Sequence, residues 1–259
     1  MKRLMAALLA ALALFSVAFA AEPVDLTTYT DEELLALVEQ AGAELRARNT
    51  PAVPDDPLAD LHYASNGKEV RINAYIGTGG DVYIPDEIDG MPVTQIHDDA
   101  LADLNMTSIR LPAGLISIGY TSFHYARNLN HVLVMPGTLR TIGGYSFWEC
   151  GAPGLVLQSD CVVSTSAFAY SKLEFCYIRK DSAVELGKDA FRDGALEVIV
   201  IPADVTKIDA AAFKGCKYLT VYCPAGSYAE QYCLENFIAC DTANYEAMVA
   251  YYEALYPAE

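Results

Sequence analysis

Apolar residues recur in the middle of the chain with a spacing of 21 to 24 residues. The most regular position holds a large apolar residue directly after a small one, and five residues before it stands an aliphatic residue. A repeat of this length predicts stacked coils, because one coil cannot bury its own apolar side without neighbours. The six members of the first position, which we expect to form an interior ladder, are Leu101, Phe123, Phe147, Phe168, Phe191 and Phe213.

Each coil also carries a short alternating segment that predicts a strand. The segment from Leu196 to Ile201 is typical, and Pro202 ends it because proline cannot donate to a ladder. Stacked coils place these strands side by side in a parallel sheet. Alternation assigns to the interior Ile109, Leu111, Leu133, Met135, Cys176, Ile178, Ile199 and Ile201.

The outward positions of the same strands are mostly apolar, although a solvated sheet face is normally polar there. We therefore predict a partner-binding stripe on this face. An alternative is that one of the terminal helices folds back and covers the stripe. The predicted stripe consists of Val132, Val134, Val156, Phe175, Tyr177, Val198, Val200 and Tyr222.

Helical patterns flank the repeats. Thr30 and Glu33 have the spacing of a capping box, and Leu34, Val38, Ala41 and Leu45 follow at helical spacing. Prolines at 51, 54 and 57 indicate a linker. Near the other end, Asp241 or Thr242 can cap a second helix. Its apolar side would hold Tyr245, Met248, Val249, Tyr252 and Tyr256.

The first twenty residues have the pattern of a secretory leader. Lys2 and Arg3 precede an apolar run from Leu4 to Val17, and Ala18-Phe19-Ala20 offers a small-residue cleavage site. An uncleaved membrane anchor is the alternative. The predicted organisation is a leader at 1–20, a helix and linker at 21–60, a solenoid of about six coils at 61–240 and a helix at 241–259.

The repeats resemble a known family. The segment Thr107–Gly119, closed by Ser122 and Phe123, is similar to the BspA-type leucine-rich repeat, and so is the segment from Val198 to Cys216. The resemblance covers about Leu61 to Cys240 and weakens between 151 and 166, which lacks the proline, and near Arg179. It implies a β-rich α/β solenoid, a right-handed leucine-rich-repeat coil with a parallel β-sheet. It also implies a surface or secreted binding protein, adhesins among its relatives, and no catalytic residues.

The net charge and the reactive side chains limit the classes of function that this chain can have. The net charge of −17 disfavours nucleic acid and anionic membranes as partners. Cys150 and Cys216 occupy one repeat position and predict free, buried thiols. A bridge among Cys223, Cys233 and Cys240 stays open. A nucleophilic pair of Cys150 with a histidine is conceivable, but the repeat accounts for both residues.

The sequence thus predicts an exported, noncatalytic module for extracellular protein–protein interaction or adhesion, located outside the cytoplasm. We expect no enzyme activity, no cofactor and no metal site, and a partner that is an extracellular protein or surface polymer. The alternatives are a structural component of the cell envelope and, less favoured, an extracellular enzyme.

Overall fold

The computed structural model describes residues 29–49 and 51–258, so the predicted leader lies outside the described residues. The helices are α2 (Asp31–Asn49), α3 (Tyr228–Asn236) and α4 (Tyr245–Leu255). The strands are β1 (Leu61–Ser65), β2 (Val70–Tyr75), β3 (Gly80–Tyr83), β4 (Glu87–Ile88), β5 (Met91–Ile96), β6 (Met106–Arg110), β7 (Ser117–Ile118), β8 (Leu133–Val134), β9 (Thr141–Ile142), β10 (Gly154–Leu157), β11 (Val162–Val163), β12 (Phe175–Ile178), β13 (Glu185–Leu186), β14 (Val198–Val200), β15 (Lys207–Ile208), β16 (Thr220–Tyr222) and β17 (Ala239–Asp241).

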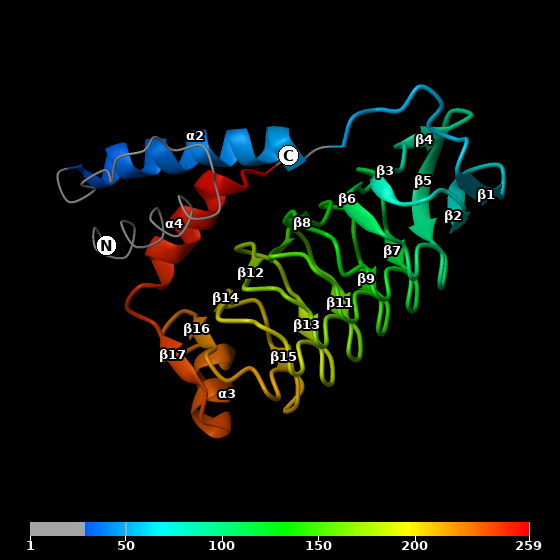
Figure 1. The fold of residues 1–259 in the computed structure, drawn as a ribbon. Coiled ribbons are helices and arrows are strands. Elements are labelled where there is room, and N and C mark those ends of the chain that lie inside the picture. The colour runs from blue at the N-terminus through cyan, green and yellow to red at the C-terminus, as the bar shows by residue number, and fades with distance from the viewer. Residues whose placement is uncertain (1–28, 50, 259) are drawn as a thin grey trace.

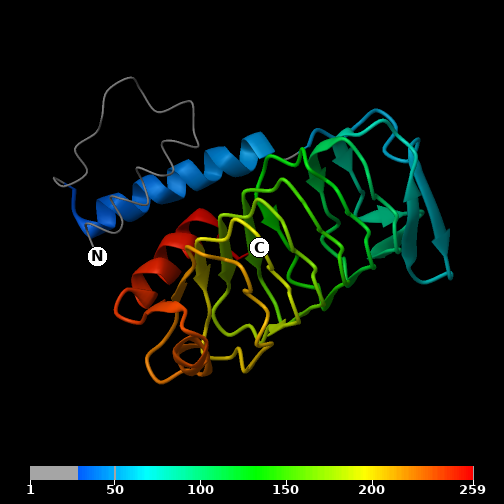
Figure 2. The same cartoon turned by 60° about the horizontal axis from the view of Figure 1, so that its bottom comes forward.

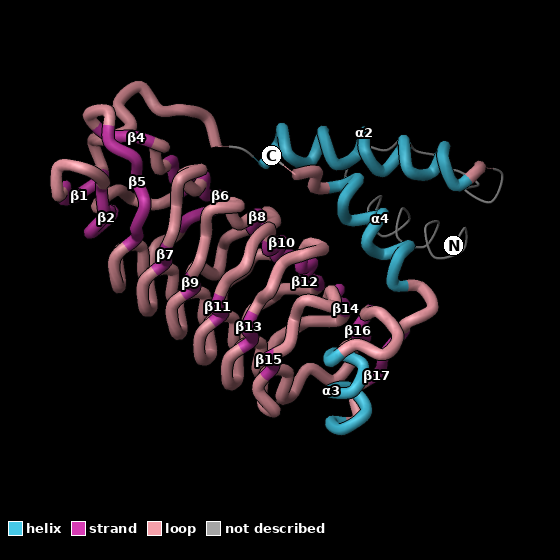
Figure 3. The backbone as a smooth tube through the Cα atoms, turned by 180° about the vertical axis from the view of Figure 1, so that it is seen from behind, coloured by secondary structure: helices cyan, strands magenta, loops and turns pink. Residues whose placement is uncertain are grey.

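The strands form two parallel columns along a β-solenoid (Figure 1). The odd-numbered strands from β5 to β15 make one column, which an antiparallel β1–β2 hairpin extends at its start. The other column runs β8-β10-β12-β14-β16-β17, and β3 pairs with β6 as a separate ladder. Each coil therefore crosses both columns, which lie on different sides of the stack (Figure 3). This arrangement confirms the predicted solenoid.

The predicted aromatic ladder is confirmed as the centre of the core. Phe123, Phe147, Phe168 and Phe191 are at most 1% exposed, and the Phe213 side chain at the end of the row is 5% exposed. Their ring centroids are 4.7, 5.0, 5.6 and 5.7 Å apart along the row, with nearly parallel planes. This spacing matches the distance of about 4.8 Å between adjacent strands. The ladder therefore keeps neighbouring coils in register.

A third side of each coil is a turn that contains the ladder residue. In most coils the residues two before and two after that position adopt left-handed backbone, including Thr121, Tyr125, Tyr145 and Tyr170 with φ between 50° and 62°. This conformation aims their N–H groups at the next coil. The Thr121 N–H donates to Gly144 O at 3.0 Å, and the Tyr170 N–H donates to Arg192 O at 2.8 Å. Most of these left-handed residues thus contribute a hydrogen bond that joins two coils.

Helices precede and follow the solenoid in the chain: α2 packs against α4, whereas the β1–β2 hairpin stands at the start of the stack. The predicted capping box of α2 is confirmed, since Glu33 N–H donates to Thr30 Oγ1 at 3.2 Å and Thr30 N–H donates to Glu33 Oε2 at 2.7 Å. The predicted cap of α4 is wrong: Asn244 is its first flanking residue, and Asp241 ends β17 instead. The Asp241 carboxylate accepts from the Asn244 N–H at 3.0 Å, so it stabilises the turn that leads into α4. No periodic pattern in the sequence indicated α3.

Candidate binding surfaces

The predicted stripe lies on the outer side of the β8–β16 column. Registered pairs place Val134, Val156, Tyr177, Val200 and Tyr222 in one row across the strands. Phe175 and Val198 are neighbours in the adjoining row. The assignment of inward and outward faces is therefore confirmed.

The expected exposure of this stripe is wrong, because α4 covers it (Figure 2). The side chains of Val156, Tyr177 and Val200 are 0% exposed, and the other five are half-buried in the same apolar cluster. The five apolar residues predicted for one side of α4 are all buried in that cluster. Partner binding through the stripe therefore stays a hypothesis, and over most of its length it would require α4 to move away.

Aromatic contacts and a hydrogen bond fix α4 on the sheet. The Tyr252 ring stacks on the Tyr177 ring at 5.1 Å and packs against the Phe175 ring at the same centroid distance. Arg179 Nη2 donates to Tyr256 O at 2.6 Å. Burial raises the pKa of Tyr252 well above its usual value of 10.0, so its hydroxyl stays neutral. The helix is thus an integral layer of the fold.

Helix α2 lies against α4 and adds a further layer (Figure 1). Leu34 and Val38 are 0% exposed, which confirms two members of the predicted apolar side. Gly42 allows the close approach, because a Cβ there would lie 2.6 Å from Leu255 O. The Arg46 guanidinium donates to the same carbonyl. The two terminal segments are therefore packed together.

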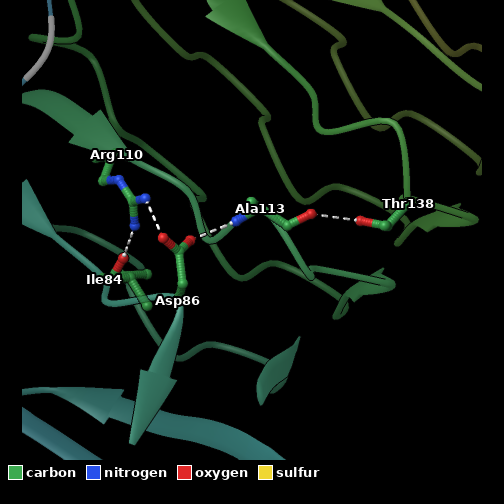
Figure 4. A network of polar contacts seen from close by, with 5 residues as sticks. All are labelled: Ile84, Asp86, Arg110, Ala113 and Thr138. Carbon is green, nitrogen blue, oxygen red and sulfur yellow. Dashed lines mark hydrogen bonds and ion pairs between the residues drawn. The ribbon is translucent and has the colours of Figure 1, made fainter. Parts of the chain in front are cut away.

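A groove remains where α4 ends, beside β6 and β8. Its walls include Arg46, Arg110, His131, Val132, Val134 and Tyr256. Figure 4 shows one side of it, where the Asp86 carboxylate pairs with Arg110 and accepts from the Ala113 N–H at 2.7 Å. Hydrogen bonding to Arg110 lowers the pKa of Asp86, so this carboxylate stays ionised. These contacts hold Arg110 in place. The groove contains Val132 and Val134, which form the end of the stripe that α4 does not cover.

A second surface lies over the coil turns and was not predicted as a site. We call it the aromatic patch, and it consists of Tyr120, Tyr145, Trp148 and Tyr170. Adjacent ring centroids in that order are 5.5, 5.2 and 4.7 Å apart. The side chains of Tyr120 and Tyr170 are 51% and 41% exposed, and those of Tyr145 and Trp148 are half-buried. Three successive coils thus present one continuous aromatic surface.

Charged side chains border the aromatic patch. Trp148 Nε1 donates to Glu149 Oε1 at 3.3 Å, and Glu149 pairs with Arg127 at 2.6 Å. The Arg127 guanidinium also lies over the Tyr125 ring, 4.2 Å from its centroid. Further along, Arg192 pairs with Asp193 at 3.0 Å. The two arginines that border the patch are therefore matched by carboxylates, and the His124 ring lies 6.3 Å from the Trp148 ring.

The cysteines and histidines weighed in the sequence do not form a reactive centre among the described residues. Burial raises the pKa of the Cys150 thiol to about 12, which leaves it protonated at neutral pH. His131 is 4% exposed, and burial lowers its pKa. The cysteines are free thiols, although the sulfurs of Cys223 and Cys240 lie 3.3 Å apart. Within residues 29–49 and 51–258, no three His, Cys, Asp or Glu side chains gather as metal ligands would.

Comparison with known proteins identifies the repeats. Residues 94–220 match the model of the BspA type leucine rich repeat region in six copies. Residues 94–220 of this chain therefore consist of BspA-type leucine-rich repeats. No curated protein matches the chain.

Solved structures similar to it include the following two. A leucine rich repeat protein of T. pallidum is 24% identical, with a TM-score of 0.48, over 65% of this chain and 71% of that one. A leucine rich cell surface protein of Faecalibacterium prausnitzii A2-165 is 22% identical, with a TM-score of 0.50. That match covers 68% of this chain and 55% of the F. prausnitzii protein. The second likeness supports the solenoid fold. In the described part of the chain, no helix has the length and apolarity needed to span a membrane.

Proposed function

We propose that the chain is an exported, noncatalytic binding module that mediates protein–protein interaction or adhesion outside the cytoplasm. The observation that carries this proposal is the aromatic patch on a rigid stack of coils. Exposed Trp and Tyr side chains are enriched at the energetic centres of protein interfaces. A fixed scaffold beneath them reduces the entropy lost on binding.

Export rests on the leader pattern of residues 1–20 and on the likeness to a F. prausnitzii protein described as a cell surface protein. The noncatalytic assignment rests on the buried, protonated thiols and on the family of the repeats. The partner in this proposal is an extracellular protein or surface polymer, with no role for nucleic acid or membrane insertion.

Two measurements test the proposed function. Mass spectrometry of the exported protein should find a mature chain that begins at Ala21. The labelled mature chain should bind bacterial surfaces or purified extracellular matrix proteins, and the double variant Tyr145→Ser/Trp148→Ser should lose most of that binding. The matched control is Tyr218→Ser, since that tyrosine is 80% exposed and belongs to a different coil. Equal binding by both variants and the wild type would contradict the proposal.

A further inference from the structure

Two residues of the aromatic patch have a backbone conformation that is unfavourable for tyrosine. Tyr145 and Tyr170 have φ values of 56° and 57°. Corresponding places in other coils hold Asp99, Asp189 or Asp193, and aspartate tolerates left-handed backbone better than tyrosine does. Packing does not require an aromatic ring at these places, because the Asp99 N–H still donates to Tyr120 O at 3.0 Å and the Asp193 N–H to Lys214 O at 2.8 Å in the next coil.

The strained residues and the gathered rings point to the same surface. Backbone strain at a bulky residue is a reason to look for function when the surrounding structure would accept an easier residue. Left-handed backbone occurs at two of the four residues whose rings contact one another and reach solvent. The two observations are independent, since one concerns the backbone and the other concerns the exposure and spacing of side chains.

The electrostatic surroundings indicate the charge of the ligand. The chain carries 34 acidic and 17 basic residues, so its overall field attracts cations. Asp98 and Asp99 hold the turn on one side of the patch, where the Asp98 carboxylate accepts from the Tyr120 N–H at 2.8 Å. Glu149 lies between Trp148 and Arg127. An anionic ligand would meet repulsion at this surface.

The molecule itself contains an example of the contact. Arg127 lies 4.2 Å from the centroid of the Tyr125 ring while it pairs with Glu149. This is a cation–π contact supported by a carboxylate, and Trp and Tyr faces are the stronger partners for such contacts. The neighbouring rings of the patch offer the same combination to a guanidinium or ammonium group from outside.

We infer that the aromatic patch binds a segment of a partner protein rich in arginine and lysine. The inference rests on the proposed function and specifies its partner. Aromatic faces would take the cationic groups, and the excess of acidic over basic residues in the chain would attract them. A neutral polysaccharide could use the rings but would gain nothing from the carboxylates, so the basic protein segment fits more of the surface.

The experiment uses Trp148 as its own reporter, because it is the one tryptophan in the chain. The mature protein is titrated with a short peptide in which arginine alternates with glycine and serine, at physiological ionic strength, where the Debye length is about 8 Å. Comparison probes are the same peptide with glutamine for arginine, the same peptide with glutamate for arginine, and a neutral β-glucan oligosaccharide. Binding is measured by calorimetry and by Trp148 fluorescence.

The arginine peptide should bind, shift the Trp148 emission and exceed each comparison probe in affinity. Tyr145→Leu and Tyr170→Asn should each weaken it, and together by at least about tenfold. Neither substitution changes the net charge, so a loss cannot come from bulk attraction. Tyr218→Leu is the control and should leave the affinity unchanged. Circular dichroism checks that the variants fold. If Tyr145→Leu does not fold, Tyr170→Asn alone tests the inference.

Three results would overturn the inference. The first is binding of the arginine peptide without a change in Trp148 emission and with equal affinity for the variants. The second is a preference for the glucan accompanied by the Trp148 shift, which would leave the proposed binding function standing. The third is no binding of the arginine peptide; in that case the surface-binding assay decides the proposed function separately.

Discussion

Thr121 is the most strained residue type in the turn column. It is β-branched and has a φ of 50°, a conformation that costs a branched side chain about 1–2 kcal/mol. Its N–H donates to Gly144 O, so the conformation is held by the next coil. The stacking of coils therefore overrides the local preference of this residue.

Substitution at this position should stabilise the protein. Thr121→Asn keeps a polar group near Asp99 and accepts left-handed backbone, so the free energy of unfolding should rise by about 1 kcal/mol. Urea denaturation measures it. Thr141→Asn is the control, since Thr141 is an exposed residue of a regular strand and should gain nothing. A Thr121 variant no more stable than the Thr141 variant would show that the turn carries no strain.

At the residue scale, the sequence predicts the ladder but not the patch. The ladder residues occupy one repeat position, so their spacing alone assigns them to the interior. Tyr120, Tyr145, Trp148 and Tyr170 occupy four different repeat positions, at −3, −2, +1 and +2 from their ladder residues. A comparison of equivalent positions therefore never brings them together. Tyrosine also gives no sequence indication of left-handed backbone, unlike glycine or asparagine.

Among the elements, α4 determines whether the outer face of the β8–β16 column is accessible to a partner. Its apolar side and the apolar stripe could each be read from the sequence, and the covering of one by the other was an open alternative. The turn that ends β17 at Asp241 sets the direction in which α4 leaves the sheet. That direction depends on a chain path after α3, which no periodic pattern encodes. The structure thus supports the alternative in which a terminal helix covers the stripe, rather than the exposed stripe that the sequence favoured.

A charge in the middle of the stripe tests this cover. Val200→Glu should lower the free energy of unfolding by about 3–5 kcal/mol, because it places an unpaired carboxylate beneath α4, where Val200 is 0% exposed. Val162→Glu is the matched control, since this strand valine is 39% exposed and its replacement should have little effect. Thermal denaturation compares the two. Equal melting temperatures would show that α4 leaves the stripe open in solution.

The whole molecule is a stack in which each coil contacts chiefly its neighbours, so its stability depends on continuous interfaces. Phe147 stacks on Phe123 at 4.7 Å and on Phe168 at 5.0 Å, and it therefore joins three coils. Phe147→Ala should cost about 3–5 kcal/mol, as for other buried aromatic residues. Denaturant unfolding measures the loss, and Tyr218→Ala should show none. An unchanged unfolding midpoint for Phe147→Ala would contradict the ladder.

The contact between α2 and α4 also determines how the molecule carries tension. Residues 51–60 connect α2 to β1 at the far end of the stack, whereas α4 follows the last strand (Figure 1). A pull between the two ends of the described chain therefore acts first on the contact of Gly42 and Arg46 with Leu255. While that contact holds, the load passes from one helix to the other and bypasses the coils. The force reaches the first and last coils only after this contact breaks. The α2–α4 pair therefore bears the load before the solenoid does.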